Sequence, residues 1–295
     1  MRRKTNAKRS LSLMTSLRDG ASPVAPAVLL TALFLLMVPQ RAAADPSPAA
    51  VAEFNIYITQ LESRLVLQHS SAEGFLAPFD AARVRGGEVV IEQVAPASGA
   101  SFPGAMLHRW RGTAFVPCAR AVDLERLLRD YGRYPQVYAP QVITARVLAE
   151  EGNSFKTLLR VSQKHVITVV LDTNYDVQFF PDAPDSTVRA RGHNISHSTR
   201  ITEIADPGAA TEHALDSKQE HGFLWRMNTY WSWEERDGGL YMQIETVTLT
   251  RSVPTGLGWA IGPFINSIPR ESLDFTLRAT ANALQHQSNS ERTEP

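Results

Sequence analysis

The sequence predicts an α+β fold: a curved antiparallel sheet wrapped around a long C-terminal helix, with an extra N-terminal helix and a short strand. Three observations predict this class. Segments of β type follow one another from residue 142 to residue 251 without intervening helices, which favours an antiparallel sheet. Asp237-Gly238-Gly239 separates two of these segments and is typical of a hairpin turn. Apolar residues then recur at helical spacing at Ile265, Ile268, Leu273, Leu277, Ala281 and Leu284.

The elements follow from local periodicity and turn residues. Val51, Phe54, Ile58, Leu61 and Leu65 predict an amphipathic helix over residues 49–68. Apolar and β-branched runs predict strands, and Pro, Gly and Asn clusters predict the turns between them. The predicted strands are 88–94, 106–116, 142–149, 154–161, 165–180, 187–193, 198–204, 222–234 and 240–251. The predicted helices are 122–131, a short helical piece ending near 138, and a final helix at 264–285. A polar connection is predicted at 206–220.

A sheet of this size has two faces, and a single terminal helix covers one of them. A sheet that curves strongly around that helix needs no second covering layer, and it leaves a cavity between the sheet and the helix. The polar residues after His286 are expected to form a disordered tail at 287–295.

The N-terminus has the three parts of a secretory signal. Arg2, Arg3 and Lys4 open a basic segment, an apolar stretch follows, and Ala42-Ala43-Ala44 precedes Asp45. The apolar stretch is too short to span a membrane. We therefore expect a signal peptide at residues 1–44, cleaved after Ala44, and an exported protein, periplasmic or secreted.

Charge and cysteine content restrict the partners. Residues 1–44 hold seven of the 30 basic residues and one of the 30 acidic residues, so the mature chain carries 23 − 29 = −6. An acidic domain without a basic stripe is not expected to bind nucleic acid. Cys118 is the only cysteine, which excludes an intramolecular disulfide, and its apolar surroundings predict a buried thiol.

The segment from Phe223 to Trp233 alternates between an aromatic set and a more polar set. Its odd positions include Trp225, Met227, Trp231 and Trp233. If this set faces the terminal helix, it forms a large apolar wall. The wall either only packs the core or both packs the core and lines a ligand-binding cavity. The predicted ligand-binding residues are Trp225, Met227, Trp231, Trp259, Leu273 and Leu277.

The order of elements resembles the START-like superfamily, also called helix-grip or SRPBCC, and most of all its bacterial branch of secreted members. Gly222 to Trp231, the hairpin that ends at Thr250-Arg251, and Ile268-Pro269-Arg270-Glu271-Ser272-Leu273 carry the resemblance. It covers about residues 105–286, so residues 45–104 form an N-terminal extension of helix and strand. The resemblance implies a cavity for an apolar or amphipathic molecule such as a lipid, not a particular activity.

The alternative hypotheses are an enzyme and a structural or interaction domain with a filled core. The enzyme would be a cyclase or dehydratase that uses Glu245 or Arg160 inside the cavity, although the sequence favours a solvent-facing position for both residues. No nucleotide, phosphate or zinc motif is present, so no cofactor or metal is expected. His193 and His197 lie on one face of a strand but lack a third ligand nearby.

A loop rich in glycine and apolar residues is predicted at Val253 to Pro263. It would serve as a lid over the cavity mouth, plug the end of the core with Trp259, or touch a membrane surface or a partner.

Overall fold

The computed structural model describes residues 45–71, 73–94, 102, 104–164, 168–181, 189–252 and 258–293, with the side chains of the last helix described over residues 268–287. The predicted signal peptide at 1–44 lies outside the described residues. The helices are α2 (Pro48–His69), α3 (Ala81–Arg85), α4 (Ala121–Arg129), the 3-10 turn η1 (Tyr131–Arg133), α5 (Tyr134–Val137) and α6 (Gly258–Thr293). The strands are β1 (Val90–Gln93), β2 (Ala105–Pro117), β3 (Val142–Glu151), β4 (Ser154–Lys164), β5 (Thr168–Pro181), β6 (Arg191–Ala205), β7 (His213–Ala214), β8 (Arg226–Arg236) and β9 (Gly239–Arg251).

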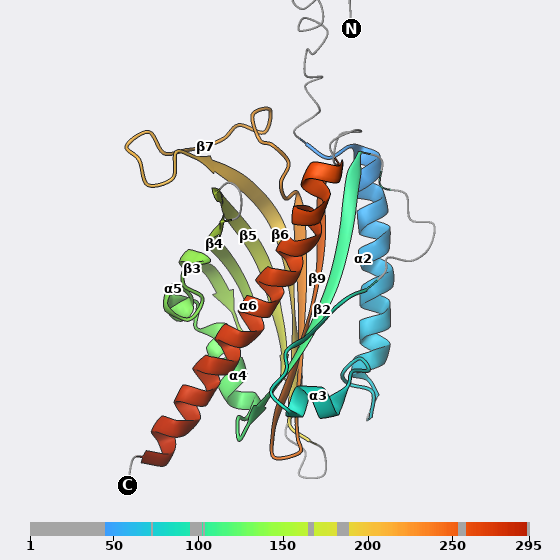
Figure 1. The fold of residues 1–295 in the computed structure, drawn as a ribbon, viewed down its shortest axis with the longest axis vertical. Coiled ribbons are helices and arrows are strands. Elements are labelled where there is room, and N and C mark those ends of the chain that lie inside the picture. The colour runs from blue at the N-terminus through green and yellow to red at the C-terminus, as the bar shows by residue number, and fades with distance from the viewer. Residues whose placement is uncertain are drawn as a thin grey trace, which may run out of the picture. The chain divides into compact units, whose positions relative to one another are not determined.

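The strands form one antiparallel sheet of nine strands. Eight of them follow the order β1-β2-β9-β8-β6-β5-β4-β3, and β7 pairs with β6. The α6 helix lies across one face of this sheet (Figure 1). This arrangement confirms the predicted α+β helix-grip fold.

The hairpin between β8 and β9 shows how local sequence sets the sheet. Asp237 and Gly238 have φ values of 54° and 75°, the left-handed conformation that a tight two-residue turn requires. The pairing then runs from Arg236 opposite Gly239 to Arg226 opposite Leu249. The predicted hairpin is therefore confirmed.

Three local predictions differ from the structure. Residues 187–193 and 198–204 were expected to form two strands, but β6 is continuous and accommodates an irregular register near Asn174 of β5. The α6 helix begins at Gly258, inside the predicted loop, and runs to Thr293, through most of the predicted disordered tail. Cys118 is exposed, because it occupies the turn after β2 with a φ of 61°.

One face of the sheet, here called the inner face, packs against α6. Trp110 of β2, Trp231 of β8 and Ile244 of β9 lie in one buried cluster with Leu273 and Leu277 of α6. The helix passes so close to β2 that a Cβ atom at Gly112 would lie 2.5 Å from the Leu277 Cδ1 atom. Glycine at this position permits the close crossing of α6 over the sheet.

The opposite face, here called the outer face, is covered by α2. Ser47 caps this helix by accepting a hydrogen bond from the Ala50 backbone N–H at 3.1 Å, and Pro48 begins it. Buried α2 side chains share a cluster with outer-face residues of the sheet, namely Phe54, Tyr57, Ile58, Leu61 and Leu65 with Trp225, Tyr230, Val247 and Leu249. The N-terminal extension thus buries the second face of the sheet.

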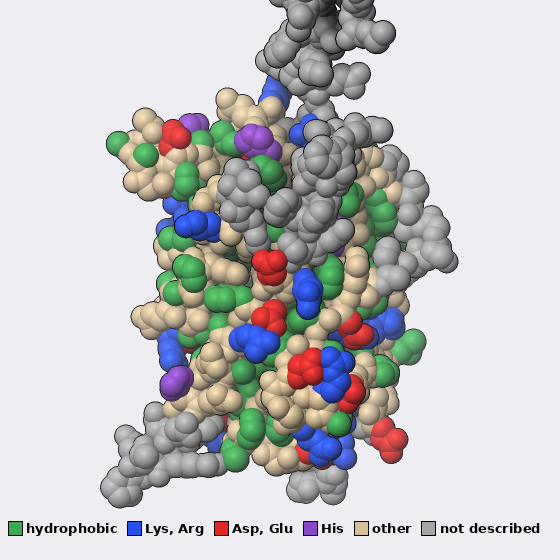
Figure 2. Space-filling view, viewed as in Figure 1, with side chains coloured by type: hydrophobic (Ala, Val, Ile, Leu, Met, Phe, Trp, Pro, Cys, Tyr) green, Lys and Arg blue, Asp and Glu red, His purple; other side chains and the backbone are tan. Residues whose placement is uncertain are grey.

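On the face shown in Figure 2, acidic and basic side chains are interspersed over α6 and beside α3. Among the helices within the described ranges, none combines the length and apolar character needed to cross a membrane.

Candidate functional site

The inner face changes from apolar to polar along its strands. At the apolar end Ala114 pairs with Met242, and Met242 with Trp233. At the other end, here called the polar end, His108 pairs with Thr248, and Thr248 with Met227. Because side chains alternate between the faces along a strand, His108 and Thr248 share the inner face with Trp110 and Ile244. The polar end lies toward the N-terminal part of α6 (Figure 1).

Several buried polar atoms on the inner face lack a hydrogen-bond partner. Of the ten such atoms within the described part of the chain, six belong to inner-face residues: His108 Nε2, Trp110 Nε1, Thr157 Oγ1, Asn194 Oδ1, Thr248 Oγ1 and Thr250 Oγ1. Three of the others belong to Arg64, Glu234 and Arg236, which form ion pairs. Native proteins pair more than about 90% of their buried polar groups, so this concentration on one face marks a candidate binding surface.

His108 is the only ionisable side chain among these six residues, and it is uncharged at neutral pH. Its side chain is 4% exposed, and burial lowers its pKa from the usual value of 6.5. A neutral imidazole offers a donor at one ring nitrogen and an acceptor at the other. His108 is therefore able to pair with a hydroxyl or with a carbonyl group.

Glu245 faces α2, not the inner face. Its carboxylate accepts a hydrogen bond from Arg64 Nη2 at 2.9 Å and two from Arg109, from Nε at 2.9 Å and from Nη2 at 2.5 Å. Arg160 is remote from it and pairs with Asp172 and Glu212, at 2.7 Å and 2.6 Å. Neither residue therefore lies inside a cavity between the inner face and α6, as the enzyme hypothesis expected of one of them, and Glu245 is buried instead of solvent-facing.

The two predicted strand histidines also lie on the outer face. His197 is hydrogen-bonded to Glu62 of α2 at 2.6 Å, and the ring of His193 lies 4.0 Å from that of His69. Burial acts to raise the pKa of Glu62, but its hydrogen bonds with His197 and Tyr230 outweigh this and lower it. Within the described ranges, no group of three or more His, Cys, Asp or Glu side chains is arranged to hold a metal ion.

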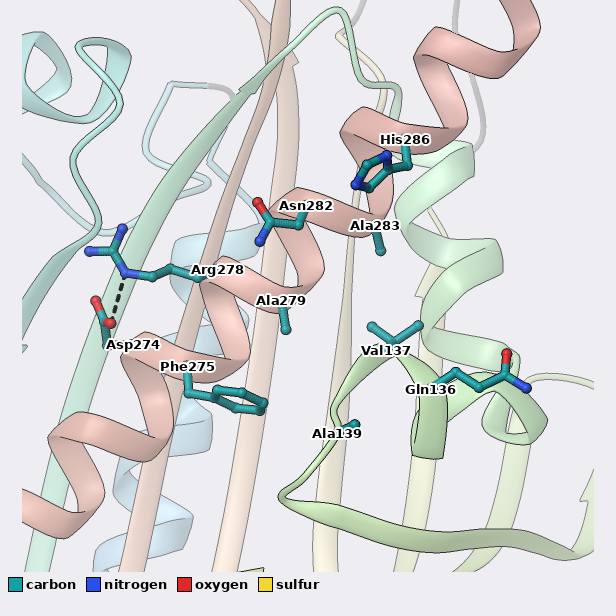
Figure 3. Close-up of a pocket in the computed structure, with 10 residues that line it drawn as sticks. All are labelled: Gln136, Val137, Ala139, Asp274, Phe275, Arg278, Ala279, Asn282, Ala283 and His286. Carbon is teal, nitrogen blue, oxygen red and sulfur yellow. Dashed lines mark hydrogen bonds and ion pairs between the residues drawn. The ribbon is translucent and has the colours of Figure 1, made fainter.

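A separate hollow of about 500 Å³ lies between α5 and the C-terminal half of α6 (Figure 3). Val137 and Phe275 contribute apolar surface to it, and Arg278 and Asp274 form an ion pair at its edge, 2.8 Å long. Next to it, the buried hydroxyls of Tyr138 and Thr280 are hydrogen-bonded at 3.1 Å and join the two helices. The hollow is open to solvent and is distinct from the inner face.

The structure brings some of the predicted ligand-binding residues together and separates others. Trp231, Leu273 and Leu277 lie in the inner-face cluster, and Met227 occupies an inner-face position opposite Thr248. Trp225 precedes the start of β8 and lies in the α2 cluster instead. Trp259 lies in α6, but its side chain is outside the described residues.

The sequence reasoning missed His108 and Thr248. Both lie in strands that were predicted correctly, and the alternation of each strand places them with Trp110 and Ile244. That alternation was the available signal, but a lone histidine or threonine in a strand is not distinctive by itself.

No family model and no curated protein matches the chain. Among solved structures it is similar to the protein TTHA0849 from Thermus thermophilus, with 14% identity, coverage of 60% of this chain and 97% of that chain, and a TM-score of 0.42. It is also similar to a STAR-related lipid transfer protein from Xanthomonas axonopodis, with 16% identity, coverage of 66% of this chain and 98% of that chain, and a TM-score of 0.41. The third structure is human STARD10, with 12% identity, coverage of 72% of this chain and 83% of that chain, and a TM-score of 0.40. The chain's own strand order and the packing of α6 establish the helix-grip fold.

Proposed function

We propose that this chain is an exported protein that binds an apolar or amphipathic small molecule between the inner face of its sheet and α6. The six unpaired polar atoms on the inner face carry the proposal. A buried polar group without a partner costs about 1–3 kcal/mol, and a bound molecule with hydrogen-bonding groups offsets that cost. The aromatic wall that contains Trp110 and Trp231 supplies the apolar contacts.

The export part of the proposal rests on the N-terminal sequence. The basic start, the apolar stretch and Ala42-Ala43-Ala44 have the pattern of a cleaved secretory signal. N-terminal sequencing of the protein recovered from outside the cytoplasm of its host is expected to begin at Asp45. An intact N-terminus on protein recovered from the cytoplasm would contradict export and leave the binding proposal in place.

The first test of binding uses the mature protein from its own host. Native mass spectrometry, followed by solvent extraction, is expected to reveal a co-purifying apolar molecule. An empty protein that also fails to take up an apolar fluorescent probe would overturn the proposal and favour a structural or interaction domain with a filled core.

A pair of neighbouring variants locates the site. Met227→Trp places a larger side chain on the inner face and is expected to reduce probe uptake at least about fivefold, because it occupies the ligand's space. Arg226→Trp is the matched control, since the preceding residue points to the outer face. Equal uptake by both variants, with circular dichroism showing both folded, would place the ligand elsewhere, for instance in the hollow between α5 and α6.

A further inference from the structure

The charged side chains of the sheet are distributed very unevenly between its two faces. On β2, β4, β5, β6, β8 and β9, every Lys and Arg that the structure describes occupies an outer-face position, as Arg109 and Arg160 do. On the same six strands the two carboxylates at inner-face positions, Glu203 and Glu235, already accept hydrogen bonds. Glu203 accepts backbone N–H groups of residues 221–223, and Glu235 accepts the N–H of Ala121 at the start of α4.

The start of α6 adds no charged residue near the polar end. Residues 258–269 of this helix contain no Lys, Arg, Asp or Glu. The guanidinium of Arg129 lies 4.3 Å from the ring centroid of Phe179, an inner-face residue, and pairs with Glu125. A ligand with a carboxylate or phosphate at the polar end would therefore bury its charge without a cation, which is strongly unfavourable.

We infer that the ligand is electrically neutral, with a hydroxyl, carbonyl or amide group beside His108 and Thr248 and its apolar part toward Trp110 and Trp231. This inference rests on the proposed function and names the chemical class of its ligand. The Thr248 hydroxyl both donates and accepts, and the unpaired Nε2 of His108 does one or the other according to its tautomer. Neutral groups satisfy both residues without an ion pair.

The orientation of the ligand follows from the gradient along the inner face. Toward the apolar end, Trp110 and Trp231 offer apolar contact. At the polar end, the His108 and Thr248 row offers the unpaired groups. An amphipathic molecule that lies along the strands matches both ends at once.

The decisive experiment compares two probes that differ only at the polar group. Lauryl alcohol and laurate compete with an apolar fluorescent probe for the wild-type protein at pH 8, where laurate is ionised. The alcohol is kept below its solubility limit and laurate below its micellar concentration. We expect the alcohol to displace the probe at a concentration at least about tenfold lower, because laurate must bury an unpaired charge. If the two compete equally, or laurate competes better, the inference is overturned and the binding proposal stands. If the protein takes up no probe at all, the binding proposal itself fails.

Two variants then test the position of the polar group. His108→Leu and Thr248→Val are each expected to weaken the alcohol about five- to tenfold and to change laurate less, because each removes a hydrogen-bonding partner of the neutral group. His213→Leu, which changes an exposed histidine on β7, is the control and is expected to leave both affinities unchanged. Unchanged alcohol affinity in both folded variants would overturn the placement at the polar end.

Discussion

The two faces of the sheet differ in how their buried polar groups are partnered. On the outer face Glu245 is 3% exposed, yet its carboxylate is held by Arg64 and Arg109. On the inner face His108 and Thr248 are similarly buried, carry no charge and leave an atom without a partner. The charged groups of the outer face are held in ion pairs with one another, whereas the unpaired groups of the inner face are neutral. The difference supports the proposal that the outer face holds α2 and the inner face binds a ligand.

The largest expected effect comes from removing the central charge of the outer face. Glu245→Gln leaves Arg109, 11% exposed, beside an uncharged amide, so we expect the free energy of unfolding to fall by about 3–5 kcal/mol. Urea denaturation measures this change. Glu88→Gln is the control, because its pair with Arg83 is exposed and is expected to have no resolvable effect. Equal stability of the two variants would show that the outer-face ion pairs do not hold α2 in place.

The next effect is a pH dependence that also belongs to the outer face. Burial, together with the charges of His193 and Arg64, lowers the pKa of His69 to about 3. Between pH 6.5 and 3 the unfolded chain therefore binds a proton at His69 that the folded protein does not. Stability is expected to fall as the pH drops through this range, by up to about 1.4 kcal/mol per pH unit.

Denaturation of the His69→Gln variant at several pH values isolates this contribution. Its stability is expected to decline less steeply with acidification than that of the wild type, whereas His213→Gln changes an exposed histidine and should retain the wild-type slope. Parallel curves for His69→Gln and the wild type would show that His69 is protonated in the folded protein.

The smallest expected change in the free energy of unfolding belongs to the inner face, and it is an increase instead of a decrease. In ligand-free protein, His108→Leu replaces an unpaired buried nitrogen by apolar atoms, so we expect the free energy of unfolding to rise by about 1 kcal/mol. Urea denaturation of the delipidated protein measures it. A loss of more than about 2 kcal/mol would mean that His108 has a partner in the protein and would remove the contrast between the faces.

Much of the fold was predictable because its signals are local. The helix at 49–68, the strand at 106–116 and the turn at Asp237-Gly238 each depend on nearby residues, and each agrees with the structure to within a residue or two. The continuity of β6 was missed because its middle is polar, whereas its pairing with β5 and β8 holds the strand extended.

The candidate site was less predictable. The alternation of side chains along β9 correctly separates the residues of its two faces, with Glu245 on one and Thr248 on the other. Both faces are buried, however. The burial pattern of this strand therefore has no period that marks the ligand side. Trp225 shows the same difficulty, since it shares the parity of Trp231 but precedes β8 and packs toward α2.

By itself the sequence determined the elements, the hairpin, the α+β class and the aromatic stretch, because these depend on residues close together in the chain. Only the tertiary structure decided which face of the sheet packs against α2 and which packs against α6. That choice depends on where α2 and α6 pack, through contacts such as Arg64 with Glu245 and Gly112 with Leu277, which join residues more than a hundred positions apart.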